Sequence, residues 1–212
     1  MSADGKSPGP FVVGIAGGSA AGKTTLSRAV AAGFDRPVLI ICLDEYYDAE
    51  RLLESSPRAD INWDHPEAIN FSGLVEDLRR LKSGLSIPTR TYDYRSHKVV
   101  FTGGQSEPTD VILIEGALLL ANPEAREHCD YRVFIYTEPS IRLARRIARD
   151  TRERGLSISD VLDWCERFVE PMHDKFIAPS MRHADLIISG EEPVDQLAAK
   201  ILEQLASLKR HR

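Results

Sequence analysis

The stretch that decides the fold is GGSAAGKTT at residues 17–25, which consists of Gly17, Gly18, Ser19, Ala20, Ala21, Gly22, Lys23, Thr24 and Thr25. Residues 17–24 fit the pattern G-x-x-x-x-G-K-[ST], between the apolar run FVVGIA (11–16) and the helix-forming segment TTLSRAVAAGF. Glycines let backbone N–H groups wrap closely around phosphate oxygens, Lys23 supplies a positive charge, and the Thr24 hydroxyl can bind Mg²⁺. The following helix directs its unpaired N–H groups at the anion. We therefore predict that this phosphate loop binds a nucleoside triphosphate; the alternative is a glycine-rich turn.

Apolar runs alternate with helical patterns along the rest of the chain. Besides residues 11–16, the predicted strands are VLIICL (38–43), VILIEG (111–116), YRVFIY (131–136) and ADLIIS (184–189). The predicted helices lie near residues 24–34, 72–83, 140–150, 159–177 and 193–208. Continuous apolar strands separated by helices predict an α/β fold, a P-loop NTPase-type parallel sheet with helices on both faces. Ligands of such sheets bind at the carboxyl ends of the strands.

Composition narrows the functional class. The chain has 212 residues, of which 42% are hydrophobic, and its polar first ten residues predict a disordered tail before one domain over 11–212. A net charge of -5 argues against a nucleic-acid partner. No stretch resembles a signal peptide or a membrane span. Cys42, Cys129 and Cys165 lack metal-ligand spacing and suit the reduced thiols of a cytoplasmic protein.

Two further segments indicate insertions around the site. Residues 84–104, GLSIPTRTYDYRSHKVVFTGG, alternate polar with aromatic or β-branched residues and predict a β-hairpin beside the sheet. The segment IRLARRIARDTRERG places four arginines on one helix face, and two more continue the charge past the helix: Arg142, Arg145, Arg146, Arg149, Arg152 and Arg154. We expect an arginine-rich lid over residues 140–157 that closes on phosphate. The alternative is a solvated basic face paired with Asp150 and Glu153.

Acidic residues stand at the ends of two predicted strands, and a third acidic residue lies in a loop. Glu115 ends the strand 111–116 beside the phosphate loop, where it would hold Mg²⁺ or cap a helix. Asp44 closes the strand 38–43, where it would orient a hydroxyl acceptor and take its proton, or serve as a turn acid. Asp64 lies in the loop INWDHPEAIN. The chain has no N-K-x-D segment typical of guanine-reading switches and is short for a motor, so a small-metabolite kinase fits best.

Taken in order, eight segments between residues 11 and 190 resemble the uridine kinase (uridine–cytidine kinase) family of P-loop kinases. They are GIAGGSAAGKTT, LDEYYD, NWDHPEAIN, YDYRSH, ILIEG, RLARRIARDTRERG, EPMHDKFIAPS and ADLIIS. The resemblance implies transfer of the γ-phosphate of ATP or GTP to the 5′-hydroxyl of uridine or cytidine, with Mg²⁺, in pyrimidine salvage. It also implies a cytoplasmic homo-oligomer, a tetramer, whose partners are the nucleoside and the nucleotide.

The resemblance assigns a role to each matching residue. Asp44 would be the catalytic acid beside the 5′-hydroxyl, and the ligands of Mg²⁺ would be Thr24, Glu115 and Asp44. Catalysis would further use Lys23, Arg146 and Arg149, while Arg146 and Arg154 meet the phosphates. The nucleoside would be bound by Tyr47 and Tyr92 at the base, His97 at its edge, and Asp64 and Arg149 at the ribose. Cross-strand packing is the alternative for Tyr92 and His97.

Three positions depart from the family pattern. Leu156 stands where a lid arginine usually reaches the base, and the runs Thr89-Arg90-Thr91 and Ile188-Ser189-Gly190 replace Leu-Pro-Val and Pro-Arg-Gly. Arg90 is a candidate for supplying the missing charge. The departures leave open a related kinase for another nucleoside, a sugar phosphate or pantothenate. A nucleotide-binding regulator without transfer activity is a further alternative.

Overall fold

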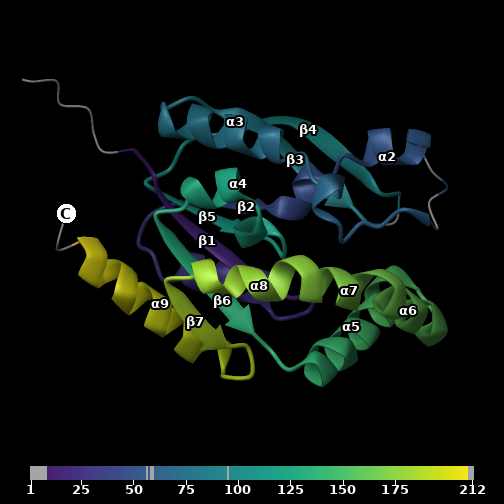
Figure 1. Cartoon of the computed structure of the whole chain (residues 1–212). Coiled ribbons are helices and arrows are strands. Elements are labelled where there is room, and N and C mark those ends of the chain that lie inside the picture. The colour runs from purple at the N-terminus through teal and green to yellow at the C-terminus, as the bar shows by residue number, and fades with distance from the viewer. Residues whose placement is uncertain (1–8, 56, 58–59, 95, 210–212) are drawn as a thin grey trace, which may run out of the picture.

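The structure, a computed structural model, describes residues 9–55, 57, 60–94 and 96–209. The tail predicted to be disordered lies outside these ranges except for residues 9 and 10. The central sheet has five parallel strands in the order β2-β5-β1-β6-β7 (Figure 1). Their bounds are β1 Phe11–Gly17, β2 Val38–Cys42, β5 Val111–Glu115, β6 Tyr131–Tyr136 and β7 Leu186–Ser189. The predicted α/β fold with a parallel sheet is thus confirmed.

Helices connect the strands and include two short ones that the sequence pattern did not predict. The long helices are α1 Lys23–Ala32, α3 Phe71–Lys82, α5 Pro139–Arg154 and α9 Val194–Lys209, and the unpredicted ones are α2 Ala49–Ser55 and α4 Pro123–Glu127. Helix α5 runs four residues beyond its predicted end, so Arg152 and Arg154 belong to its last turn. No helix within the described ranges is long and apolar enough to cross a membrane.

The segment predicted as one helix over 159–177 alternates between α-helical and π-helical turns. Helices α6 Ile158–Trp164, α7 Glu170–Met172 and α8 Ala178–Ser180 are joined by π-helical turns at Cys165–Val169 and His173–Ile177. Pro171 and Pro179 each follow one of these wider turns. A proline lacks an N–H donor and its ring clashes with the carbonyl four residues earlier, so the wider turn accommodates it.

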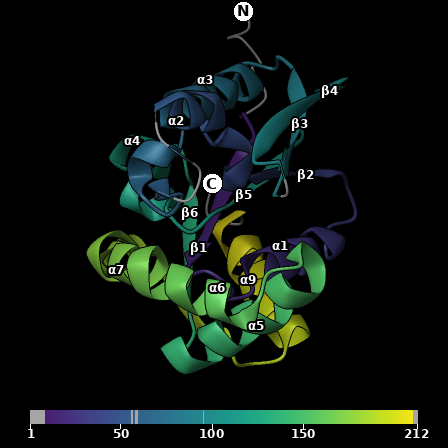
Figure 2. The same cartoon turned by 90° about the vertical axis from the view of Figure 1, so that its right-hand side faces the viewer.

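The sheet is packed on both faces because β1 alternates its side chains. Val12 and Ala16 join a core that includes Leu74 and Leu78 of α3, whereas Ile15 joins the core under α1 and α9. Figure 2 shows α3 and α4 on one side of the strands and α1 and α9 on the other. Helices therefore cover both faces of the sheet, so we expect ligands to bind at the carboxyl ends of the strands.

The predicted hairpin is present as a separate antiparallel pair, β3 Ile87–Asp93 with β4 Lys98–Ser106. Arg90 fastens it to the main body, because its Nη2 donates to Asp77 Oδ2 at 2.5 Å and its guanidinium lies 4.5 Å over the Tyr46 ring. The Tyr46 hydroxyl donates to the same carboxylate at 2.9 Å. Arg90 therefore anchors the hairpin to α3 and does not line the cavity beside the phosphate loop. Arg95 of the YDYRSH segment lies outside the described residues.

Candidate active site

The phosphate loop turns sharply between β1 and α1. Gly22, with φ at +103°, is the N-cap of α1, a left-handed conformation that glycine adopts without steric cost. Gly18 lies so close to Arg142 that a Cβ atom there would be 2.9 Å from the arginine Cδ. The Lys23 ammonium donates to the carbonyls of Gly17 at 3.1 Å and Gly18 at 2.9 Å. The loop therefore curls over the N-terminus of α1, where unpaired helical N–H groups favour an anion.

Most of the predicted site residues line one cavity of about 580 Å³ at the carboxyl ends of the strands. They are Ser19, Ala20, Lys23, Thr24, Asp44, Tyr47, Asp64, Tyr92, His97, Glu115, Arg146, Arg149 and Arg154. A second cavity of about 420 Å³ adjoins it and is lined by Ala20, Ala21, Gly22, Lys23, Thr24, Thr25 and Arg149, among others. Gly17 and Gly18 line neither cavity and pack instead against Ile135 and Arg142.

Two side chains with oxygen atoms that could bind a metal lie in contact at the end of β5, beside the phosphate loop. The Thr24 hydroxyl donates to Glu115 Oε1 at 2.6 Å, and Glu115 is 3% exposed. Hydroxyl and carboxylate oxygens are the ligands that Mg²⁺ prefers, so this pair fits the metal. Burial lowers the pKa of Lys23, against the opposing effect of the Glu115 and Asp44 carboxylates. The loop end of the cavity thus combines a cation with acidic oxygen donors.

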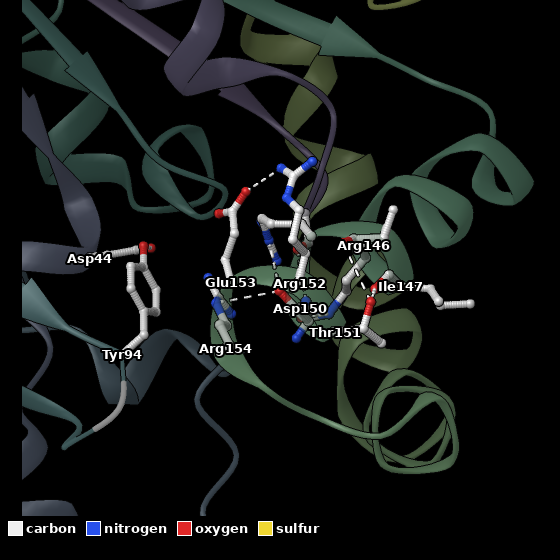
Figure 3. Close-up of polar contacts among 12 residues, drawn as sticks. Asp44, Tyr94, Arg146, Ile147, Asp150, Thr151, Arg152, Glu153 and Arg154 are labelled. Carbon is white, nitrogen blue, oxygen red and sulfur yellow. Dashed lines mark hydrogen bonds and ion pairs between the residues drawn. The ribbon is translucent and has the colours of Figure 1, made fainter.

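Three of the lid arginines form ion pairs with one buried carboxylate. Asp150 is 1% exposed, and its oxygens lie 2.7 Å from Arg149 Nε, 3.2 Å from Arg146 Nε and 3.4 Å from Arg154 Nε (Figure 3). Arg146 also donates to the Ser19 hydroxyl of the phosphate loop at 2.7 Å. Three arginines that line the cavity are therefore held around a single acid, and Arg146 links this cluster to the loop.

The remaining lid arginines differ in environment. Arg142 is buried and pairs with Glu170 at 3.0 Å, and Arg145 donates to the Gly190 carbonyl at 3.0 Å. Arg152 pairs with Glu153 at the surface. The expected pairing with Asp150 and Glu153 is present, but Asp150 and Arg142 are buried, so the arginines of α5 do not form one solvated face.

Aromatic rings form the other end of the cavity. Tyr47 lies 4.8 Å from Tyr92 and 5.6 Å from Trp63 between ring centroids, and Trp63 stacks on His97 at 4.6 Å. The Tyr92 hydroxyl and His97 Nδ1 share a hydrogen bond of 2.7 Å. These rings offer flat apolar surfaces together with polar atoms, which suits a planar heterocycle.

Helix α6 and the residue Leu156 before it contribute apolar side chains to the cavity wall. Leu156, Val161 and Trp164 line the cavity, and Leu156 presents a hydrocarbon side chain where the resembling family has an arginine. Burial raises the pKa of Asp64, while the Arg146 charge and a hydrogen bond from the Trp164 indole oppose this shift. The cavity wall at Leu156 is therefore less basic than the family pattern implies.

Several cavity residues were not predicted from the sequence, among them Trp63, Tyr94 and Asp150. Trp63 and Tyr94 belong to the segments NWDHPEAIN and YDYRSH but were not predicted to bind a ligand, and Asp150 was expected as a partner on a solvated face. Asp150 lies four residues from both Arg146 and Arg154, a spacing that predicts helical ion pairs and could have identified it. No local pattern marks Trp63 or Tyr94, because their contacts are to distant segments.

Comparison with known proteins places these features in a family. Residues 12–195 match the family model described as Phosphoribulokinase / Uridine kinase family. A uridine kinase of Lactobacillus johnsonii is 37% identical over 206 residues, which cover 94% of this chain and 98% of that protein. Uridine kinase-like protein 5 of Arabidopsis thaliana is 37% identical over 180 residues, which cover 84% of this chain and 39% of that longer protein.

A solved structure extends the likeness to the fold. Phosphoribulokinase from Rhodobacter spheroides superposes with a TM-score of 0.63 at 16% identity, over 89% of this chain and 75% of that one. The family match spans the phosphate loop, the hairpin and the lid, which are the parts that build the cavity. This chain belongs to the phosphoribulokinase / uridine kinase family.

Proposed function

We propose that this protein transfers the γ-phosphate of ATP or GTP to the 5′-hydroxyl of uridine or cytidine. The observation that supports it is that the phosphate loop, Asp44 and the aromatic rings line one and the same cavity. Such a cavity can hold a triphosphate at one end and a planar base at the other. The relative from Lactobacillus johnsonii, similar over nearly its whole length, is called a uridine kinase.

In the proposed reaction the 5′-oxygen bonds to the γ-phosphorus while the bond from that phosphorus to the β–γ bridging oxygen breaks. Asp44 orients the hydroxyl and accepts its proton, and the nucleoside diphosphate leaves with the bonding electrons. Lys23 and the lid arginines Arg146, Arg149 and Arg154 stabilise the charge on the transferred group. Thr24, Glu115 and Asp44 would hold Mg²⁺, which when bound neutralises charge on the phosphate oxygens.

At the acceptor end, we assign the base to the aromatic rings. Tyr47 and Tyr92 would flank it, and His97 would bond its edge, since an imidazole presents either a donor or an acceptor. Asp64 and Arg149 would hold the ribose hydroxyls. We also expect a cytoplasmic homo-tetramer from the family resemblance, which sedimentation would test.

Leu156 favours a second candidate, a related kinase for another hydroxylated metabolite. Its side chain lines the cavity without offering a hydrogen bond, so a pyrimidine edge loses one charged donor. A missing hydrogen bond of this kind weakens selection by about 1–3 kcal/mol. An acceptor with fewer polar groups at that edge would lose less binding free energy.

A panel of acceptors tests the proposal. The protein is incubated with ATP, Mg²⁺ and separately with uridine, cytidine, adenosine, pantothenate or a sugar phosphate, and ADP release is measured. ADP release that depends on uridine or cytidine supports the proposal, and release that depends on another acceptor supports the second candidate. No ADP release with any acceptor, while ATP still binds, would instead indicate a nucleotide-binding regulator.

A further inference from the structure

One side chain outside the assigned set touches the proposed catalytic carboxylate. The Tyr94 hydroxyl donates to Asp44 Oδ2 at 2.6 Å, from the turn of the hairpin that follows β3. Figure 3 shows the phenol ring ending at the Asp44 carboxylate. Tyr94 lies 50 residues from Asp44 in the chain, so this contact joins the hairpin directly to the carboxyl end of β2.

The same ring also contacts the lid. The Arg154 guanidinium carbon lies 4.0 Å from the Tyr94 ring centroid, which is within the range of a cation–π interaction. Arg154 is one of the three arginines gathered by Asp150. Tyr94 therefore contacts the proposed proton acceptor with its hydroxyl and the lid with its ring.

Tyr94 is held between a neighbouring ring and the Asp44 carboxylate. Tyr92 packs edge-on against it with ring centroids 4.9 Å apart, which holds the ring. On the other side, its hydroxyl donates to Asp44 Oδ2. The phenol is thus a donor, and it uses an Asp44 oxygen that an acceptor hydroxyl would need.

A capped carboxylate matters because ATP can also react with water. In that side reaction a water oxygen bonds to the γ-phosphorus, the bond to the β–γ bridging oxygen breaks, and ADP leaves. The water proton passes to Asp44, as the acceptor proton does in transfer. A phenol hydrogen-bonded to Asp44 Oδ2 competes with water for that oxygen. A nucleoside held by the aromatic end of the cavity brings its hydroxyl with additional binding contacts, so it competes better than water.

We propose that Tyr94 is a positioning residue that caps Asp44 until the acceptor hydroxyl displaces its phenol, and that thereby suppresses hydrolysis of the bound triphosphate. The contact with Arg154 places the lid against the hairpin in the same capped state. This inference rests on the proposed role of Asp44.

Tyr94→Phe is the direct test, because it removes the hydroxyl and keeps the ring. The rate of ATP hydrolysis without acceptor is expected to rise roughly 10-fold. This factor corresponds to the loss of one hydrogen bond to a charged group. Uridine, titrated by calorimetry in the presence of Mg²⁺ and a non-hydrolysable ATP analogue, is expected to bind more tightly by a similar factor, since no phenol has to be displaced. A residue with a merely structural role would lower transfer and weaken uridine binding without raising hydrolysis.

Tyr136→Phe is the matched control. The Tyr136 hydroxyl also donates to a carboxylate, Glu138, at 2.7 Å, but it lies at the end of β6 outside both cavities. Its loss should change neither hydrolysis nor uridine binding. Tyr94→Leu, which removes the ring as well, should raise hydrolysis and also raise the KM for ATP by loosening Arg154.

The outcomes separate this inference from the proposed function. Unchanged hydrolysis in Tyr94→Phe, or uridine binding that is unchanged or weaker while the wild type binds it, overturns the capping role. Failure of the wild type to bind or phosphorylate any pyrimidine nucleoside overturns the proposed function instead. The hydrolysis measurement needs no acceptor, so it decides on Tyr94 in either case.

Discussion

At the scale of single residues, the segment LDEYYD shows how a carboxylate is held at a strand end. Leu43 and Tyr46 are 1% and 3% exposed, and they fix the 3-10 turn that carries Asp44 between them. The Tyr46 hydroxyl bonds Asp77, so this tyrosine is structural. Tyr47 instead enters the cavity. The backbone is therefore set by buried neighbours, which leaves the Asp44 side chain to project into the cavity.

Glu45 in the same turn predicts a pH dependence of stability. Burial is the main cause that raises its pKa from 4.5 to about 7 in the folded chain. Because the folded state holds this proton more tightly, the free energy of unfolding should fall as pH rises through the window from about 4.5 to about 7. Glu45→Gln should remove the contribution of Glu45 to this pH dependence. The free energy of unfolding of the variant, relative to that of wild type, should therefore increase as pH rises through this window.

Urea unfolding at several pH values from 4.5 to 8 measures this difference. Glu50→Gln, on the exposed face of α2, is the control and should follow the wild-type profile. A constant offset between Glu45→Gln and wild type at all pH values would contradict the prediction.

At the scale of elements, helix α5 depends on its one buried acid. Replacing Asp150 by Asn leaves Arg146, Arg149 and Arg154 without their shared carboxylate. Breaking a buried ion pair in this way should cost on the order of 3 kcal/mol of stability. The freed arginines should also raise the KM for ATP, because they are no longer held facing the cavity.

Glu153→Gln provides the matched control on the same helix. Glu153 pairs with Arg152 (Figure 3), and both side chains are exposed. Exposed pairs contribute about 0–1 kcal/mol. In denaturant unfolding and ATP kinetics, Asp150→Asn should therefore show a lower free energy of unfolding and a higher KM for ATP than Glu153→Gln. Equal effects of Asp150→Asn and Glu153→Gln would show that the buried carboxylate does not organise the lid.

Elements were predictable from sequence where a long local pattern existed. The five strands were found because their apolar runs are continuous, and the hairpin because its residues alternate. Helix α4 was missed although Asn122 caps it and Pro123 begins it, because five residues carry no apolar period. The π-helical turns were missed because periodicity does not show how a helix accommodates Pro171 and Pro179.

At the scale of the whole molecule, the cavity lies between parts that are distant in the chain. The phosphate loop, Asp44, Glu115 and the arginine cluster could be predicted as site residues because each belongs to a local motif. The contacts of Tyr94 with Asp44 and of Arg90 with Asp77 could not, because they arise only when the hairpin docks. Arg90 was considered for the base, and its engagement by a buried acid excludes it from the cavity.

Docking of the hairpin predicts a selective effect on the acceptor. Arg90→Met leaves the 9% exposed Asp77 side chain without its cation, which should cost about 3 kcal/mol of stability. Tyr92 and His97 belong to the hairpin, so the KM for the acceptor should rise well above wild type while the KM for ATP changes little. Steady-state kinetics with each substrate varied in turn measure both values. Equal increases in the two KM values would contradict this role of the hairpin.

The central claim is that Asp44 takes the proton of a pyrimidine nucleoside in phosphate transfer. The most direct measurement follows labelled γ-phosphate from ATP into uridine 5′-monophosphate, using wild type and Asp44→Asn, with ATP binding measured in parallel. We predict labelled product from wild type and a rate roughly 10²–10⁴-fold lower for Asp44→Asn, with ATP affinity nearly unchanged, since a general base contributes about that factor. Turnover of Asp44→Asn within a few-fold of wild type would contradict the account.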